Sequence, residues 1–390
     1  MMKKLFKNCD VILADKVLKD GAVLVEDGKI VWLGTASEAL NYRVDEVVDC
    51  EGKFLSPGFI DVHCHGGGGG MFMTPDLQQH VNALKAHMAH GVTSMTPTSI
   101  VNNAEEMKKL AEIKKTIDGM DNLPNHLGYF MEGPYNIPHP DVAVGSDELP
   151  VITEDKYAPI IEASEGTIKR WMAAPELEGA LDFGRYIKTH GIIPCMGHSN
   201  ATYNEVEAAT KAGYSTVIHL YSVMSTVTRD KGFRRGGLVE AGFLIDDLDV
   251  ELICDGCHLP PELINLAIKV KGYDKIMLVS DAIPLAGMGL EGEFEMMGMK
   301  LVIEDGVCKP LARNCFMGSI ATGDRLVRTV HKTCGHPLWA AVRMASKTPA
   351  RHLGYEGIKG EIAIGADADL ITFDEDINIH QVFLKGRKAI

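Results

Sequence analysis

The chain has 390 residues, 46% of them hydrophobic and 24% charged, a composition typical of a soluble globular protein with a large core. Its net charge of −14 argues against a nucleic-acid-binding protein, and no run of about 18 uncharged apolar residues is present to span a membrane. The first residues do not resemble a secretory signal, and nine scattered cysteines favour a reduced, cytoplasmic setting.

Both ends of the chain are expected to form short β-strands. Residues 10–15, 21–34 and 47–58 are rich in Val, Ile and Leu and are separated by Asp-Gly and Glu-Gly turns. Residues 365–390 have the same character. We therefore expect residues 1–55 and 356–390 to pair into one small domain.

Strands and helices alternate in the middle of the chain. Helical periodicity is found at 80–91, 103–118, 180–191, 202–213 and 260–272. Short apolar runs typical of strands are found at 92–100, 126–134, 192–199, 215–222 and 275–282. This alternation predicts a parallel sheet that closes into a (β/α)8 barrel over residues 56–355.

Polar residues recur at the points where these apolar strands end. The residues in question are His63, His65, Glu132, His198, His219 and Asp281. Any one of them alone is more often a hydrogen-bonded structural residue or a helix cap than a ligand. Because the carboxyl ends of barrel strands converge on one mouth, where active sites are built, their repeated position favours a shared site.

The segment "HCH" has the spacing of a metal motif. Residues two apart lie on one face of a strand, so His63 and His65 can face one cation while Cys64 points away. Imidazole nitrogen suits Zn²⁺ and Fe²⁺, and the remaining residues can complete one metal site or two adjacent ones. Asp281 is the candidate for proton transfer, a role that is compatible with capping the following helix.

The ordered motifs resemble the amidohydrolase superfamily and, within it, the N-acetylglucosamine-6-phosphate deacetylases. The resemblance rests on "PGFIDVHCHGGGG", "MEGP", "AAPE", "GHSNATYNE", "IHLYSVMS", "CDGCHLPPE", "LVSDA", "FMGS" and "KGEIAIGADADLITFD". It implies a (β/α)8 barrel flanked by a β-sandwich from both termini, usually in a homodimer. It also implies hydrolysis of N-acetylglucosamine 6-phosphate to glucosamine 6-phosphate and acetate.

The resemblance further implies a metal and a set of ligands. Glu132, His198 and His219 correspond to the ligands of the principal ion, and a chain that keeps both His63 and His65 is expected to hold a second ion. The expected metal is zinc, with iron, manganese and cobalt as alternatives.

The residues expected to bind the sugar depart from the family pattern. The resemblance implies substrate contacts from Ser222, Val223, Arg229, His258 and Met317. Ser222-Val223 stands where the family usually has Asn-Ala. Thr228 occupies the position before Arg229 where the family usually has a histidine. The basic residues between 229 and 235 form either a phosphate site or a solvated charged loop.

Two other functions remain open. The first is deacetylation of a different N-acetylated amino sugar, with or without a phosphate, or another amidohydrolase reaction. A cyclic-amide hydrolase is disfavoured because Glu132 occupies the strand end where such enzymes commonly use a modified lysine. The second is a barrel that lost its chemistry and became a scaffold, which is disfavoured because all six strand-end residues are retained.

Overall fold

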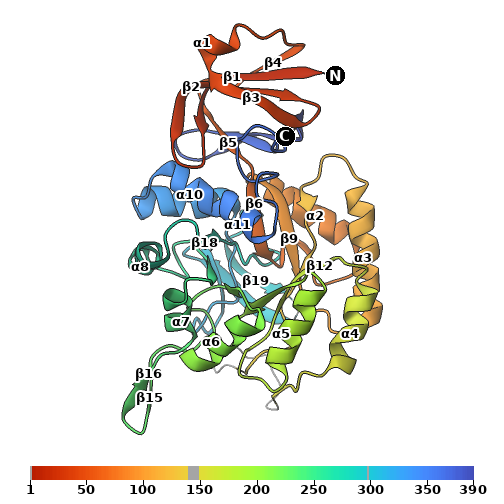
Figure 1. Cartoon of the computed structure of the whole chain (residues 1–390), viewed down its shortest axis with the longest axis vertical. Helices are drawn as coiled ribbons and strands as arrows, with labels where there is room; N and C mark the ends of the chain where they lie inside the picture. Colours follow the sequence, from red (N-terminus) through yellow and green to blue (C-terminus); the bar gives the residue numbers. More distant parts are fainter. Residues whose placement is uncertain (1, 139–148, 297) are drawn as a thin grey trace.

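The computed structural model describes residues 2–138, 149–296 and 298–390. Its centre is a barrel of eight parallel strands (Figure 1). In spatial order the strands are β6 (Phe59–Cys64), β9 (Val92–Ser99), β11 (Tyr129–Met131), β12 (Ile168–Met172), β13 (Ile193–Met196), β14 (Thr216–Val217), β17 (Asp249–Leu252) and β18 (Ile276–Leu278). A parallel bridge between Cys64 and Ala282 joins the last strand to the first, which confirms the predicted barrel.

Helices follow the barrel strands and most of them cover the outer face (Figure 1), while the last one reaches the amino end of the barrel, where Arg351 and His352 contact Asp249. They are α2 (Leu77–Met88), α3 (Ala104–Asp118), α4 (Glu154–Ala163), α5 (Ala180–Thr189), α6 (Tyr203–Ala212), α7 (Leu238–Leu244), α8 (Pro261–Lys271), α9 (Gly323–Arg328), α10 (Leu338–Ala345) and α11 (Lys347–His352). A π-helical turn, Thr329–Thr333, continues α9. Across the described ranges, none of the helices has the length and apolar character needed to cross a membrane.

Local capping explains where the predicted helices begin. Asn103 accepts a hydrogen bond from the Glu106 N–H, so α3 begins at Ala104, within one residue of the prediction. The helix predicted from residue 80 instead begins at Leu77, because Asp76 caps it through the Gln79 N–H.

Several elements were absent from the sequence-based prediction. Two are the barrel strands β12 and β17, and others are α4, α7 and the helices after residue 320. A three-stranded antiparallel sheet also follows the barrel strands, formed by β19 (Gly292–Met296), β20 (Met299–Glu304) and β21 (Val307–Pro310). The strand β12 reads "IKRWM" and β17 reads "DVEL", so buried charges interrupt the apolar pattern that would have identified them.

Strands from both ends of the chain form a second sheet beside the barrel (Figure 1). They are β1 (Lys3–Ile12), β2 (Val17–Glu26), β3 (Lys29–Thr35), β4 (Glu46–Asp49), β5 (Phe54–Pro57), β22 (Leu370–Phe373), β23 (Ile379–Leu384) and β24 (Arg387–Lys388), with the short helix α1 (Ala36–Ala39). The rings of Phe6 and Phe383 meet edge to face, 4.8 Å apart, inside a core shared by both termini. The pairing of the two ends is as expected, while the boundaries at 55 and 356 stay a prediction.

Candidate metal centre and active site

Six side chains from five barrel strand ends converge around Glu132. They are the residues singled out from the sequence: His63, His65, Glu132, His198, His219 and Asp281. They fall into two groups of possible metal ligands, one formed by His63, His65 and Asp281 and the other by Glu132, His198 and His219. Each role remains a prediction, but the structure brings all six together at the carboxyl end of the barrel.

One oxygen of Glu132 faces a pair of histidines. Oε1 lies 3.1 Å from Nε2 of His198 and 3.0 Å from Nε2 of His219. The two histidine nitrogens lie only 3.2 Å from each other. Two imidazole nitrogens directed at one another and at one carboxylate oxygen form a donor set that suits a divalent cation.

The other oxygen of Glu132 faces the first-motif histidines. Oε2 lies 2.8 Å from Nε2 of His65 and 3.3 Å from Nε2 of His63. Oδ1 of Asp281 lies 3.3 Å and 3.4 Å from the same two nitrogens. Glu132 therefore lies between both groups, and each of its oxygens would be available to a cation held by one of them.

The charges in this cluster are mutually stabilised. Burial opposes ionisation of Glu132, but His63, His198 and His219 hold the pKa of its carboxyl well below the ordinary value. Burial also opposes protonation of His65, yet Asp281 and Glu132 raise its pKa to about 9. Protons on His63 and His65 thus balance the carboxylates, and a divalent cation would replace these protons.

The backbone at three of these residues adopts an unusual conformation. The φ angles are 45° at His198, 27° at His219 and 46° at Asp281, all in the left-handed region that residues other than glycine rarely occupy. Such strain persists where surrounding contacts enforce it, and it is typical of functional sites. The strand ends are therefore turned to present these side chains to the cluster.

Two buried charged residues that the sequence analysis missed hold His63 in place. Nδ1 of His63 lies 2.9 Å from Oε2 of Glu251, and Glu251 is paired in turn with Arg170. Arg170 also donates to the carbonyl of Val62 and lies 4.5 Å from the ring centroid of Phe130. Burial opposes the charge on Glu251, but Arg170 and His63 lower its pKa to about 2. An ionised Glu251 fixes the ring orientation of a histidine whose other nitrogen faces the centre.

We expect Glu251→Gln to weaken both metal binding and folding. Loss of the carboxylate leaves the buried Arg170 without its partner, which should lower the free energy of unfolding by about 3–5 kcal/mol in urea titrations. Metal affinity should fall roughly 10–100-fold, as expected for a residue that orients a ligand. The double variant Arg170→Met, Glu251→Leu separates the effects: stability should recover while metal affinity stays low. Unchanged metal affinity in both variants would contradict the positioning role.

The "AAPE" motif supports the loop that carries His198. The Glu176 carboxylate accepts a hydrogen bond from the Ser199 hydroxyl at 2.7 Å and another from the Asn200 N–H. The motif was recognised in the sequence without a role, since the sequence does not reveal this contact across 23 positions.

The residues predicted to contact the sugar are less closely grouped. Ser222 and Val223 follow His219 directly, and the Ser222 N–H donates to the His219 carbonyl. Met317 packs with a separate cluster around Leu301, and Nδ1 of His258 lies 2.7 Å from an Asp255 oxygen.

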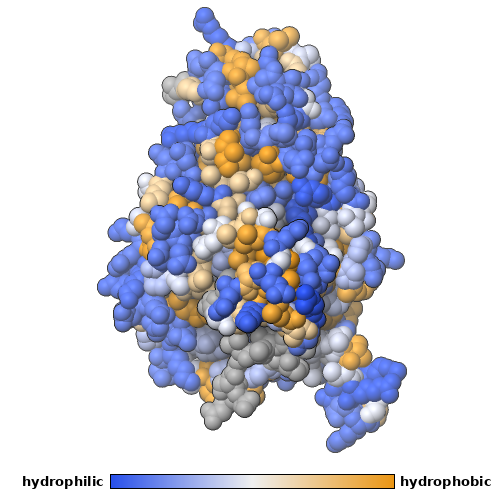
Figure 2. All heavy atoms as spheres, turned by 180° about the vertical axis from the view of Figure 1, so that it is seen from behind, coloured by the Kyte–Doolittle hydropathy of each residue, from blue (hydrophilic) through white to orange (hydrophobic). Residues whose placement is uncertain are grey.

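Arg229 belongs to a projecting hairpin. The strands β15 (Thr228–Asp230) and β16 (Phe233–Arg235) extend away from the barrel (Figure 1). The surface of this hairpin is largely hydrophilic (Figure 2). Arg229 lies directly opposite Arg234 in the hairpin register, and both are exposed.

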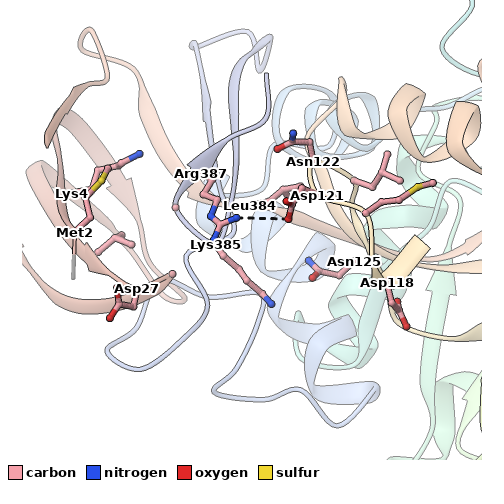
Figure 3. Close-up of a pocket in the computed structure, with 15 residues that line it drawn as sticks. Met2, Lys4, Asp27, Asp118, Asp121, Asn122, Asn125, Leu384, Lys385 and Arg387 are labelled. Carbon is pink, nitrogen blue, oxygen red and sulfur yellow. Dashed lines mark ion pairs between the residues drawn. The ribbon is translucent and has the colours of Figure 1, made fainter. Parts of the chain in front are cut away.

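A large cavity elsewhere does not contain this site. A space of about 640 Å³ lies where the terminal sheet meets the barrel, with Lys385 and Arg387 on one side and Asp118 and Asp121 on the other (Figure 3). Its lining includes none of the predicted site residues, and Arg387 pairs with Asp121 at 3.7 Å on the exposed surface. The candidate active site, where the six strand-end side chains converge, is therefore a different part of the molecule from this cavity.

Comparisons with known proteins agree with the geometry. Residues 54–389 match the amidohydrolase family. The chain is 30% identical to the N-acetylglucosamine-6-phosphate deacetylase of Caenorhabditis elegans, over 98% of this chain and 94% of that protein. It is also 30% identical to the N-acetylgalactosamine-6-phosphate deacetylase of Escherichia coli O157:H7, over 88% of this chain and 89% of that protein. The crystal structure of N-acetylglucosamine-6-phosphate deacetylase from Pasteurella multocida aligns with a TM-score of 0.89 at 27% identity, covering 99% of both chains.

Proposed function

The chain belongs to the amidohydrolase family and, within it, to the N-acetylglucosamine-6-phosphate deacetylases, and from this we propose its reaction. It hydrolyses the acetamide of N-acetylglucosamine 6-phosphate to give glucosamine 6-phosphate and acetate. The observation that carries the proposal is the convergence of the six strand-end side chains around Glu132 in a chain that matches deacetylases over nearly its whole length.

The amidohydrolase family is metal-dependent, and the proposed cofactor is one or two divalent ions, with zinc as the ion that best suits imidazole and carboxylate donors. Glu132, His198 and His219 would hold one ion, and His63 and His65 the other. A bound divalent ion supplies polarisation of the amide carbonyl and a lowered pKa for water beside it.

Asp281 performs the proton transfers in this proposal. Its carboxylate is ionised, because His63 and His65 outweigh the effect of burial and hold its pKa below the ordinary value. Asp281 Oδ1 accepts a proton from the water that attacks the amide carbon. The same oxygen then donates this proton to the amine nitrogen as the C–N bond breaks and acetate leaves.

The hairpin around Arg229 is the proposed phosphate-binding element. Like charges directly opposite each other in an antiparallel pair destabilise it, so Arg229 and Arg234 are best accommodated by a bound anion. Because the hairpin projects from its own barrel, we propose a homodimer in which it reaches toward the other subunit's substrate (Figure 1). Ser222, Val223, His258 and Met317 are the other proposed substrate contacts. All nine cysteines have free thiols, which supports the proposed cytoplasmic location.

A second candidate substrate is N-acetylgalactosamine 6-phosphate. The relative from Escherichia coli that carries this name is as similar in identity as the relative from Caenorhabditis elegans. The two sugars differ only at the C4 hydroxyl, so the choice between them depends on contacts outside the metal centre. The departures from the family pattern at Ser222, Val223 and Thr228 lie in the segment proposed to bind the sugar.

The test is acetate release from a panel of substrates by the zinc-loaded enzyme. N-acetylglucosamine 6-phosphate is expected to be hydrolysed with a kcat/KM far above that of unphosphorylated N-acetylglucosamine. The third substrate of the panel is N-acetylgalactosamine 6-phosphate. Arg229→Ala should raise KM for the phosphorylated sugar about 10–100-fold, since a charge-assisted contact contributes about 1.5–3 kcal/mol. The control is Arg185→Ala, which replaces an exposed arginine on α5 that pairs with Asp182. This variant should leave kcat and KM unchanged. Absence of acetate release from every phosphorylated sugar would overturn the proposed function.

A further inference from the structure

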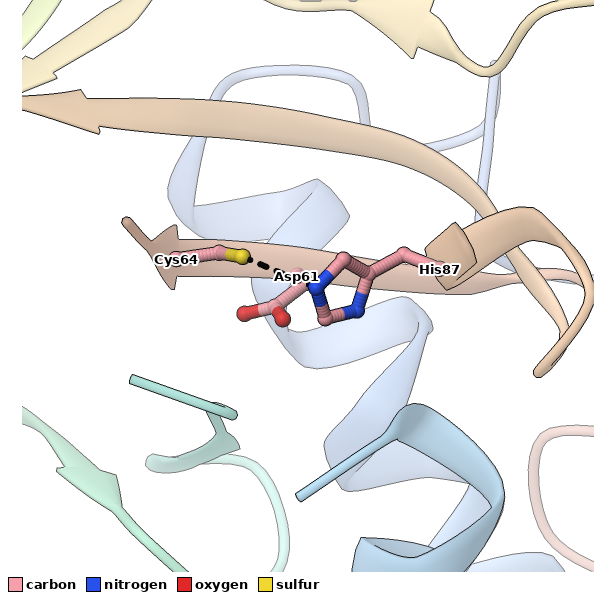
Figure 4. A group of neighbouring side chains, drawn as sticks. All are labelled: Asp61, Cys64 and His87. Carbon is pink, nitrogen blue, oxygen red and sulfur yellow. Dashed lines mark hydrogen bonds between the residues drawn. The ribbon is translucent and has the colours of Figure 1, made fainter. Parts of the chain in front are cut away.

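A third cluster of possible metal ligands lies on the opposite face of the strand that carries the first motif. It consists of Asp61 and Cys64 on β6 and His87 on α2, whose ligand atoms all lie within 4.8 Å of one another. The three residues are almost completely buried, with exposed fractions of 4%, 0% and 1%. Figure 4 shows the Cys64 sulfur directed at the His87 ring, with the Asp61 carboxylate beside the same ring.

An irregularity in β6 brings Asp61 and Cys64 to one side. Asp61 pairs with Met95 and Cys64 with Pro97, so β6 has one residue more than its neighbour over this stretch. Such a bulge changes the direction of the side chains that follow it. His63 and His65 thereby face the mouth, while Cys64 packs in the core cluster that includes residues of α2. The expectation that Cys64 points away from the two histidines agrees with this arrangement.

The cluster contains polar atoms that lack hydrogen-bond partners. Oδ1 of Asp61 accepts bonds from the His63 and Ser280 N–H groups at 3.2 Å and 3.3 Å, but its Oδ2 is buried without a partner. Nδ1 of His87 is also buried without a partner. A buried, unsatisfied carboxylate oxygen is costly, so its presence beside a thiol and an imidazole requires an explanation.

The donor atoms around His87 suit a small divalent cation. Nε2 of His87 lies 3.2 Å from the Cys64 sulfur and 2.9 Å from the carbonyl oxygen of Gly66. With the carboxylate of Asp61, the thiol and the imidazole provide oxygen, sulfur and nitrogen donors from three side chains, a set that suits zinc. The catalytic cluster, in contrast, has only imidazole and carboxylate donors among its six residues.

We propose that Asp61, Cys64 and His87 form a further, thiolate-containing binding site for a divalent cation such as Zn²⁺. Binding replaces the proton of the Cys64 thiol, which is released to solvent, so that the thiolate becomes a ligand. The cation joins β6 to α2 and to the glycine loop after His65. It thereby stabilises the strand that presents His63 and His65 from behind, without contact with the substrate.

Cobalt substitution of the full-length protein tests this site separately from catalysis. A Co²⁺–thiolate bond gives a charge-transfer absorption in the near ultraviolet, which imidazole and carboxylate ligands do not give. The cobalt-loaded wild-type protein is expected to show this band and to contain about one ion more per chain than Cys64→Ser. Cys64→Ser should lose the band and that ion while keeping the ions bound at the mouth.

A second buried cysteine provides the matched control. Cys254 is also completely buried, but it belongs to none of the ligand clusters in the described residues. Cys254→Ser should keep both the band and the metal content. If the wild-type protein with cobalt bound at the catalytic cluster shows no charge-transfer band, the proposal is wrong. This result does not depend on whether the Cys64→Ser variant folds. A band that persists in Cys64→Ser would equally overturn it.

Discussion

Asp281→Asn is expected to lower kcat/KM for the phosphorylated amino sugar by about 10²–10⁴-fold, the usual contribution of a general acid–base group. Asparagine keeps the shape of the side chain and an oxygen near His63 and His65, but it cannot accept the proton of the attacking water. Metal content should therefore remain close to that of the wild type. The measurements are steady-state acetate release and metal analysis of the same preparation.

The control for this substitution is a buried aspartate at the other end of the barrel. Asp249 begins β17 and is held by Arg351 and His352, at 2.7 Å and 2.9 Å. Asp249→Asn removes a buried, paired carboxylate as Asp281→Asn does, so it should reduce stability while kcat per folded molecule stays unchanged. Full activity of Asp281→Asn would exclude Asp281 as the proton-transfer residue and would leave it the role of a ligand or a helix cap.

The sequence predicted the barrel and the six residues at its mouth for the same physical reason. In a parallel barrel each strand is a short apolar run, and the residue after the run lies at the mouth. His63, His198 and His219 could thus be grouped although they span 157 positions, and the structure brings them within reach of Glu132.

The supporting residues could not be predicted in this way. Arg170 and Glu251 lie inside β12 and β17, and a buried charged pair makes a strand look like a surface segment in the sequence. Each charge is tolerated only because the other lies beside it, across 81 positions of sequence. Burial and pairing of this kind are properties of the folded chain, so local periodicity gives no sign of them.

The grouping of Asp61 with Cys64 was hidden for a different reason. Regular alternation along a strand puts residues three apart on opposite faces, and only the bulge in β6 reverses this relation. His87 looked like one more position in an amphipathic helix. Regular alternation therefore explains why the first motif could be read from its spacing, and the bulge explains why the cluster behind it could not.

Glu132→Gln is expected to have the largest effect on metal content. Each oxygen of Glu132 faces a different group of histidines, so replacing one oxygen by an NH₂ group removes a ligand atom and the negative charge between four imidazoles. After dialysis, both ions at the mouth should be lost, and activity should fall at least about 10³-fold, since a catalytic metal contributes several kcal/mol to transition-state stabilisation. Metal analysis and acetate release measure the two effects. Glu361→Gln, which alters a carboxylate paired with Lys347 at 2.7 Å outside the cluster, should retain both ions and full activity.

The number of ions that Glu132→Gln loses also distinguishes a bridging carboxylate from a ligand of one ion. A bridge requires that both sites at the mouth empty together, so metal analysis of the dialysed variant should show a loss of two ions per chain relative to the wild type. If Glu132 serves only His198 and His219, the site of His63 and His65 should keep its ion, and the loss should be one ion per chain. If the variant retains both ions and full activity, Glu132 is not a metal ligand. Its position between the two groups would then have no functional explanation.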